Sequence, residues 1–523
     1  MGVVQGTSHP EHVVMDAELV SGHLLPPGSV FAFLAEHRRE LFPDAMFADL
    51  FPSQLGRPSV PADVVAAVLV LQALEGRSDR EAVEALTFDL RWKAACGLPI
   101  AAAGFHPTVL TYWRRRLAAS ARPQRIFDAV REVVAATGAL AGKTRRVLDS
   151  TVLTDAVATQ DTVTQLIAAI RRVAREVPGA AEVVAAHCTG HDYDDPGKPQ
   201  IAWDDAEARA ELVDALVSDA HRLLGHLPEQ ELAPRPAEAV ALLALIAGQD
   251  VEPAEGSDGT DGRWRIARRV AEDRIISTVD PDARHAHKTV TRRVDGFKAH
   301  LVAEPDTGLI TGCTLTRASG PDTGDGAVGL GLLAADRTID APVQVLADSA
   351  YGTEAMLAAL AAAGHTAVIK PWPLHSLISG GFTAADFAID ESAGTVTCPA
   401  GHTVGYTPGT RIARFGDRCT RCPLRARCTT STRGRSVLVA EHDALTRAHR
   451  AHAADPDFQA VYRRHRPMVE RSIAWITRGA RRVPYRGVLP NDAWLHLRVA
   501  AINLRRLLTL GLTGTGGHWA LNA

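Results

Sequence analysis

The sequence of 523 residues lacks the features of secreted and membrane-spanning proteins. Residues 1–12 show no basic start followed by an apolar stretch, so no secretion signal is expected. The longest apolar runs, 64–71 and 239–247, are too short to cross a bilayer and are expected in core helices. The seven cysteines are then expected in a reducing compartment, as thiols or metal ligands rather than disulfides. These absences predict a cytoplasmic protein with no membrane partner.

An excess of positive charge is also missing. The chain has 57 Lys and Arg against 60 Asp and Glu, a formal net charge of −3, and only 5% aromatic residues. It is therefore not a general polycation, and binding to nucleic acid would have to come from local basic patches. The hydrophobic content of 46% is ample for a buried core, and the length suggests about two to four domains.

The N-terminal region, residues 20–140, has the apolar spacing of helices. Ser78 followed by Glu81 is the pattern of a capped helix start. A further helix over 108–117 carries three consecutive arginines: Arg114, Arg115 and Arg116. We predict an all-helical N-terminal domain whose basic helix contacts DNA. The alternative is that these arginines only form a solvated helix face.

The pattern changes to an α/β type after residue 143. Strands are predicted at 146–153, 297–303, 309–316, 343–348 and 366–370, with helices between the later ones. A long helical stretch, about 155–275, interrupts them and has acidic, Pro- and Gly-rich loops at 192–197 and 252–262. This order predicts a mixed sheet flanked by helices.

Two aspartates, Asp149 and Asp348, follow apolar runs of strand type. A carboxylate in such a place costs desolvation unless something compensates it, and a divalent cation such as Mg²⁺ is one good compensation. The alternative is that both are turn or capping residues. A third candidate is Glu470, which shares a helical spacing of four with Tyr462 and Arg466, although Pro467 indicates a kink or a new helix start.

This pattern resembles the DDE transposases of bacterial insertion sequences, whose catalytic core is an RNase H-like fold. The matching motifs are Leu-Asp-Ser-Thr at Asp149, Ala-Asp-Ser-Ala-Tyr-Gly at Asp348, and Glu470 with Arg466 four residues before it. Gly56–Ser59, Ser78–Glu81 and the segment 295–300 also match. Two positions depart from the family pattern: Tyr462 lies four residues before Arg466 rather than three, and Thr477 with Arg478 next stands where a Lys is common.

The resemblance spans about residues 20–510, and the three acids lie farther apart than a compact core needs, so insertions are expected. It implies the following division: a helical N-terminal domain at 20–140, an RNase H-like core at 143–154, 285–394 and 455–512, a helical insertion at 155–284, and a zinc-ribbon-like insertion at 395–432.

The resemblance also implies a function. Asp149, Asp348 and Glu470 would bind Mg²⁺ or Mn²⁺ and catalyse DNA cleavage and strand transfer, since two metals can activate the nucleophile and stabilise the leaving oxygen. The partners would be double-stranded DNA, as element ends and target, and a second copy in a homodimer associated with the nucleoid. Two alternatives remain open: a transposase-derived DNA-binding protein without catalysis, and a nuclease of the same fold without strand transfer.

Arginines crowd the region around Glu470, which is the only acid between residues 462 and 486. Phosphate neutralisation explains this density better than a generic charged surface helix, which stays as the alternative. The candidate DNA contacts here are Arg463, Arg466, Arg471 and Arg478, and Lys298 is a weaker one.

Four of the cysteines are clustered: Cys398, Cys419, Cys422 and Cys428. A Cys-x-x-Cys pair with two further cysteines nearby is good spacing for a zinc ribbon, and His402 is an alternative ligand. Reduced thiols without metal, a disulfide or an iron–sulfur cluster are the other readings of the same residues. The sequence therefore predicts structural Zn²⁺ in addition to Mg²⁺.

Overall fold

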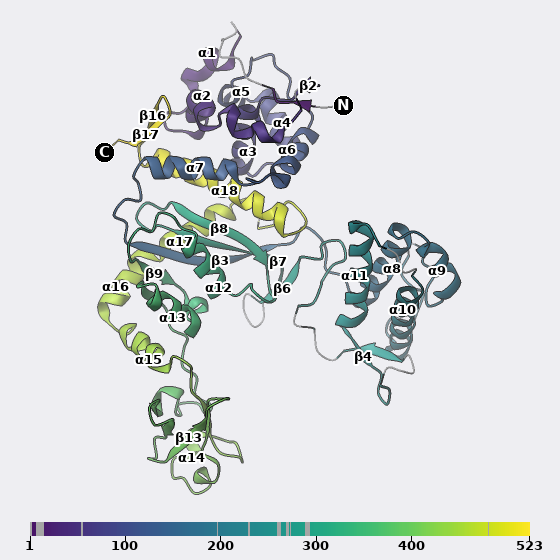
Figure 1. Cartoon of the computed structure of the whole chain (residues 1–523), viewed down its shortest axis with the longest axis vertical. Helices are drawn as coiled ribbons and strands as arrows, with labels where there is room; N and C mark the ends of the chain where they lie inside the picture. Colours follow the sequence, from purple (N-terminus) through teal and green to yellow (C-terminus); the bar gives the residue numbers. More distant parts are fainter. Residues whose placement is uncertain are drawn as a thin grey trace.

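The computed structural model describes residues 3–6, 15–53, 56–195, 197–227, 231–258, 263–267, 271, 273–287, 293–479 and 481–522 (Figure 1). Most of the segment 1–12, and parts of the two loops expected at 192–197 and 252–262, lie outside the described residues. None of the described helices is long and apolar enough to cross a membrane.

Helices dominate the N-terminal part, at the top of Figure 1. The most apolar of them is buried along nearly its whole length and ends at Gly76, whose positive φ of 70° suits the left-handed helix cap. Ser78 and Glu81 form the predicted capping box. The helices are α1 (Ala17–Ser21), α2 (Val30–Leu41), α3 (Ala62–Glu75), α4 (Asp79–Phe88), α5 (Leu90–Cys96), α6 (Thr108–Ala119) and α7 (Arg125–Ala136).

One detail of this part differs from the all-helical expectation. A short parallel pair joins β1 (Val3–Val4) to β2 (Arg57–Pro58). Since it is only two residues long, no periodicity could announce it in the sequence.

The central layer is a mixed sheet, as the strand pattern predicted, but it has six strands, because β6 joins the five expected ones. β3 (Arg145–Thr154) lies in its middle, parallel to β9 (Gln344–Ala347) and antiparallel to β7 (Arg293–Ala303). β10 (Thr366–Ile369) extends the parallel side, while β8 (Ile310–Arg317) and β6 (Arg284–His287) both pair with β7. The register aligns Asp149 with Leu301 and Ser150 with His300.

Helices cover both faces of this sheet, because successive strand residues point to opposite sides. Leu148 and Val302 pack with α12 (Asp325–Ala334) and α13 (Glu354–Ala362). Val147 and Leu346 pack on the other side with α16 (Pro456–His465) and α17 (Pro467–Ile476). The long α18 (Val488–Thr509) lies between β8 and the N-terminal helices, and one hydrophobic core runs through all three.

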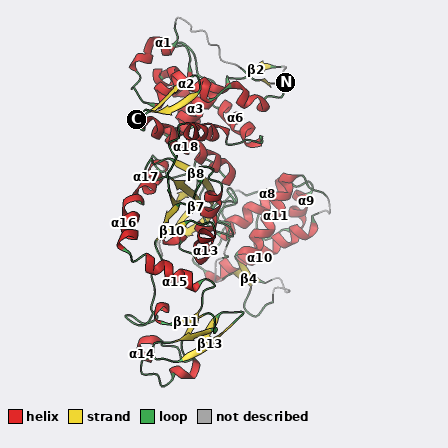
Figure 2. Ribbon diagram, turned by 60° about the vertical axis from the view of Figure 1, so that its left-hand side comes forward, coloured by secondary structure: helices red, strands yellow, loops and turns green. Residues whose placement is uncertain are grey.

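Two further parts project from this body (Figures 1 and 2). The first is a helical bundle with its own apolar core and the small pair β4 (Val251–Pro253) and β5 (Trp264–Ile266). Its helices are α8 (Thr162–Glu176), α9 (Ala180–His187), α10 (Ala206–His226) and α11 (Pro234–Gln249).

The second is a small antiparallel sheet that carries the clustered cysteines and is joined to the body through α15 (Asp443–His452). Its strands run from β11 to β15 in chain order, so the sheet begins before residue 395 and ends after residue 432. The elements are β11 (Ala388–Asp390), β12 (Thr395–Thr397), β13 (Thr403–Thr407), β14 (Ile412–Arg414), α14 (Arg425–Cys428) and β15 (Ser436–Leu438). The chain then returns to the top, where β16 (Leu512–Thr515) and β17 (His518–Leu521) form a hairpin beside α2.

Candidate active site

Asp149 lies in the middle of β3 and is buried. Its Oδ1 accepts a hydrogen bond from the Ser150 backbone N–H (2.8 Å), and its Oδ2 lies 2.9 Å from Nη2 of Arg466. Burial raises the pKa of the Asp149 carboxyl, and the Arg466 guanidinium works against that rise. The arginine therefore compensates the desolvation that made this aspartate conspicuous in the sequence.

Asp348 follows β9 directly and caps the short turn Ser349–Tyr351, where its Oδ1 accepts from the Ala350 N–H (2.9 Å). Its Oδ2 lies 3.8 Å from the same Arg466 Nη2. The side chain keeps 44% of its surface exposed, so a ligand can still reach it. Because β3 and β9 are parallel neighbours, the two aspartates meet at one place although they are far apart in the sequence.

Arg466 stands at the junction between α16 and α17, immediately before Pro467. Pro467 occupies the first turn of α17, so the stretch is two helices rather than one, as its sequence indicated. Arg466 is buried, with 6% of the residue's surface exposed, and its Nη1 also donates to the Leu148 carbonyl (3.2 Å). Burial alone would lower the pKa of this guanidinium, but Asp149 outweighs it and the pKa is raised. Arg466 is thus a fixed counter-charge to both aspartates.

Glu470 lies one turn farther along, in the first turn of α17, and is exposed. Within the described residues, no group of three or more His, Cys, Asp or Glu side chains is arranged to hold a metal ion. The structure thus brings Asp149 and Asp348 together around Arg466, and leaves Glu470 on the adjacent helix turn outside a metal-ready cluster.

A second polar group lies next to these acids, and Asp325 is the one member of it for which the sequence carried no sign. Lys298 forms an ion pair with Asp325 at the start of α12 (3.2 Å), and His300 approaches the same carboxylate (3.6 Å). The phenol of Tyr351 is buried, and burial followed by Asp325, Asp149 and Asp348 raises its pKa. The signal for Tyr351 was present in the Ala-Asp-Ser-Ala-Tyr-Gly motif. Asp325 had no such signal, since it precedes an ordinary helix.

The three arginines of α6 differ in their surroundings. Arg114 pairs with Asp79 and its guanidinium lies 5.2 Å from the centroid of the Tyr485 ring. Arg116 donates to the Leu50 carbonyl (2.6 Å) and stacks on Phe51. Among the three, Arg115 is exposed to solvent, whereas Arg114 and Arg116 are partly buried.

The arginines around Glu470 are more open than those of α6. Arg463, Arg471 and Arg478 are all exposed, and Arg463 donates to the Gln459 carbonyl of its own helix (3.1 Å). Arg466, by contrast, faces inward to the aspartates. The arginines predicted around Glu470 therefore include one that is buried against the aspartates, Arg466, and several that are exposed to solvent.

The four clustered cysteines lie around one small cavity of about 20 Å³, together with His402. The Arg435 backbone N–H donates to Sγ of Cys419 (3.4 Å), a contact that suits a thiolate ligand. Burial raises the pKa of the Cys428 thiol, the Arg435 guanidinium lowers it, and the other three cysteines raise it. The thiols converge, but their present arrangement is not that of a metal centre.

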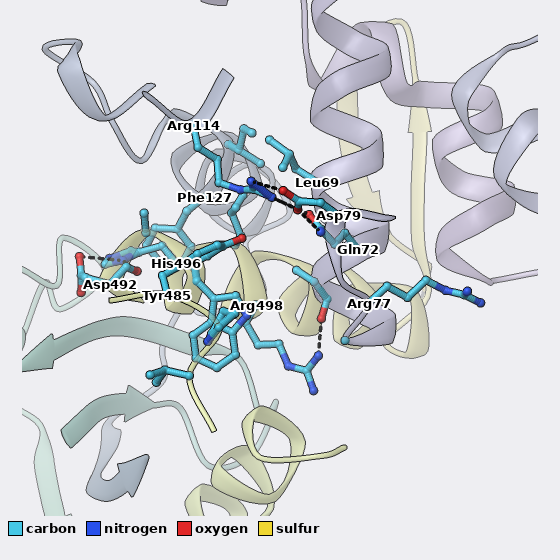
Figure 3. A pocket seen from close by; sticks show the side chains of 18 of the residues that line it. Leu69, Gln72, Arg77, Asp79, Arg114, Phe127, Tyr485, Asp492, His496 and Arg498 are labelled. Carbon is cyan, nitrogen blue, oxygen red and sulfur yellow. Dashed lines mark hydrogen bonds and ion pairs between the residues drawn. The ribbon is translucent and has the colours of Figure 1, made fainter. Parts of the chain in front are cut away.

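A larger cavity of about 650 Å³ lies between the N-terminal helices and the C-terminal ones, away from the two aspartates (Figure 3). Its walls come from the end of α3, the start of α4, α6, α7, the loop after α17, and α18. Arg114, Arg478, Arg482 and Arg498 contribute to it.

Comparison with known families gives two matches. Residues 23–116 match the family described as "Transposase domain (DUF772)", and residues 397–508 match the family described as "Transposase DDE domain". The second match includes Glu470 and the clustered cysteines, while Asp149 and Asp348 lie outside both. No curated protein and no solved structure matched the chain.

Proposed function

We propose, on the premise that the chain is a DDE-class transposase of the insertion-sequence type, that it binds its element's terminal repeats and cuts and joins DNA at Asp149, Asp348 and Glu470. The observation that carries this proposal is the meeting of Asp149 and Asp348 on neighbouring parallel strands, with an arginine between them. Rigid strands are a good base for a catalytic constellation, and a central strand flanked on both sides is what an RNase H-like core would supply.

The acid set fits a hard divalent cation in its chemistry, because all three donors are carboxylate oxygens. Mg²⁺ or Mn²⁺ held by Asp149, Asp348 and Glu470 would supply an activated water and stabilisation of the leaving oxygen. The chain's own contribution is positional. Arg466 lies between the two aspartates at the N-cap of α17, and Glu470 follows it by one helix turn, after Pro467.

DNA would be held by the outward cations. Arg463 and Arg471 on the helices around Glu470, Arg478 just after α17, and Arg115 on α6 are exposed and can neutralise phosphates. Arg114, Arg116 and Lys298 have internal partners, so their proposed contact with DNA would require these to be exchanged. We further propose the domain division given above, action as a homodimer, and association with the nucleoid in the cytoplasm.

The cysteine-bearing sheet is proposed to hold one Zn²⁺ through Cys398, Cys419, Cys422 and Cys428. The support is that all four thiols line one cavity and one already accepts a backbone N–H. Metal analysis of the purified chain tests this: Cys422→Ser should lose the zinc, whereas Cys188→Ala, in the helical bundle, should keep it. Equal zinc content in both variants would contradict the assignment.

The decisive experiment for the reaction is cleavage of labelled duplex DNA that contains the element's end. Wild type should cut in Mg²⁺ or Mn²⁺, and Asp348→Asn and Glu470→Gln should bind the duplex but not cut it. Asp340→Asn, an exposed carboxylate on the loop after α12, is the matched control and should cut normally.

Other outcomes select the alternatives. Because no metal-ready cluster is present in the described residues, a DNA-binding protein without catalysis is the second candidate. Binding without cleavage by wild type in either metal would favour it. Cleavage without joining to a target duplex would favour a nuclease of the same fold.

A further inference from the structure

The cavity of about 650 Å³ is separate from the aspartates and has the size of small-ligand pockets, which span about 300–1,000 Å³. It lies where the two segments matched by transposase families face each other: α3, α4 and α6 on one side, and the loop after α17 with α18 on the other. Figure 3 shows Arg114, Tyr485 and Arg498 gathered in it, with Arg77 directed away from them.

One part of its wall is apolar and aromatic. Leu69, Leu117 and Phe127 are buried, while Tyr485 and Trp494 are partly exposed. Tyr485 is fixed in place, since its backbone N–H donates to Asn491 (3.0 Å) and its ring lies against Arg114. Flat aromatic faces that stay partly open can stack with a planar base.

The acids in the wall already have partners. Asp79 is held by Arg114 and Gln72, and Glu81 by the capping box with Ser78. Asp492 accepts from the Leu315 backbone N–H (2.8 Å) and pairs with His496 (3.3 Å). Two of these carboxylates therefore have a basic side chain as partner, whereas Glu81 accepts hydrogen bonds alone and keeps its charge.

Three wall arginines have no such carboxylate partner in the part of the chain that the structure describes. Arg498 is 4% exposed, donates to the carbonyls of Trp475 (3.2 Å) and Arg478 (2.7 Å), and has an Nε without a hydrogen-bond partner. Arg482 donates only to the Asp155 carbonyl (3.0 Å), and Arg478 is exposed at the rim. Burial, followed by repulsion from Arg505 and Arg478, lowers the pKa of Arg498.

We propose that this cavity binds one nucleotide unit, with its phosphate at Arg478 and Arg482 and its base between Tyr485 and Trp494. Guanidinium groups hydrogen-bond phosphate oxygens in charge-assisted pairs, and the aromatic wall stacks the base without selecting it. The nucleotide comes either from solution or from a DNA strand, as a unit unstacked from its neighbours. Only the DNA source rests on the proposed function.

Two fluorescent probes separate these sources: 2-aminopurine deoxyriboside 5′-monophosphate, and a short single-stranded oligonucleotide with 2-aminopurine at a phosphorylated 5′ end. Each is titrated into the full chain without divalent metal, so that cleavage plays no part. Stacking in the cavity should quench the fluorescence, and inorganic phosphate should compete. Quenching of both probes with equal affinity assigns a free nucleotide, and quenching of the oligonucleotide alone assigns a DNA strand.

The variants are chosen to fold. Leu489 lines the cavity, is 81% exposed and lies in the first turn of α18, where a carboxylate is tolerated. Leu489→Glu should weaken binding about tenfold, because its carboxylate repels the phosphate. Leu489→Gln, which has the shape of glutamate without its charge, should leave binding unchanged. Arg478→Gln should also weaken it about tenfold, against Arg209→Gln on α10 as control.

The proposal is overturned if neither probe is quenched, or if Leu489→Glu and Leu489→Gln bind alike. Asp348→Asn should bind both probes as wild type does. Wild type that binds the probes but does not cut DNA in Mg²⁺ or Mn²⁺ would therefore refute the proposed reaction and leave this site standing.

Discussion

Two pairs of carboxylates lie close to β3, one at Asp149 on the strand and one at Asp155 just after its end, and they are balanced in different ways. Asp149 and Asp348 share the Arg466 guanidinium, and Asp348 remains half open to solvent. Asp155, just after the end of β3, faces Asp280, and both are buried with no ion pair to a basic side chain among the described residues. Burial and then Asp280 raise the pKa of Asp155 to about 6.

The difference teaches what each pair can do. A pair that shares an arginine can exchange that cation for another. A pair without one reduces its repulsion by holding a proton, and so ties structure to pH. The basic side chain beside a carboxylate pair, rather than the place of the pair near β3, therefore decides whether the pair suits a metal ion or a proton.

The largest expected effect comes from a third site near β3, where a single carboxylate has an arginine of its own. Arg146, also on β3, pairs with Asp336 at 2.8 Å, and both side chains are fully buried. Arg146→Met should lower the free energy of unfolding by about 3–5 kcal/mol, because it leaves a buried charge unpaired. Urea unfolding measures this, with Arg145→Gln, at a partly exposed neighbour, expected to cost far less. Equal costs would mean that the pair is not what stabilises this end of the strand.

A smaller loss is expected for Arg466→Gln, since Asp348 can be solvated when its partner goes. We expect a loss of about 2–3 kcal/mol in the metal-free protein, below the range for a fully buried pair. Mn²⁺ should then raise the melting temperature of this variant more than that of wild type, because the arginine no longer competes for the aspartates. Arg464→Gln, on the exposed side of α16, is the control. If Mn²⁺ stabilises wild type and both variants equally, Arg466 does not occupy the cation's place.

The smallest effect should come from Asp155→Asn, and it depends on pH. The pKa of Asp155 is raised in the folded protein, so the folded state binds more protons than the unfolded one between about pH 4 and pH 6. Wild type therefore loses stability as the pH rises through that window, and the variant should not. At pH 7 the variant should be more stable by about 1–2 kcal/mol, and at pH 4 the two should be alike.

Urea unfolding at both pH values checks this, beside Asp204→Asn, an exposed carboxylate that should follow wild type at each pH. A gain that is equal at pH 4 and pH 7 would show that proton binding by Asp155 is not its source.

Local patterns in the sequence were enough for five of the six strands of the sheet, all but β6, and for the helix break at Pro467. Apolar runs located the strands, and adjacent parallel strands then placed Asp149 and Asp348 together. The capping box at Ser78 and Glu81 was likewise a short-range signal. Such features depend on residues within a turn or a strand, so a single sequence carries them.

Partners that are distant in the sequence could not be predicted in this way. Nothing near Arg466 indicates that its charge points inward to Asp149, and nothing near Arg114 indicates Asp79. An arginine carries the same charge whether it contacts solvent, DNA or an acid from another element. Composition alone therefore cannot show which of these three is its partner. The sequence also could not show that Glu470 stays apart from any group of side chains arranged to hold a metal ion in the described residues, because this depends on how α17 packs.

The place where the helical bundle joins the body has a consequence for how the chain can be rebuilt. The outgoing and returning segments run side by side: the Gln160 backbone N–H donates to the Ile276 carbonyl (2.8 Å), and the Thr278 N–H to the Gln160 side chain (2.7 Å). The bundle has a separate core and is therefore an insertion whose two connecting segments pair with each other where they leave the body. Replacing the bundle with a short bridge between these segments would leave every strand of the central sheet in the chain.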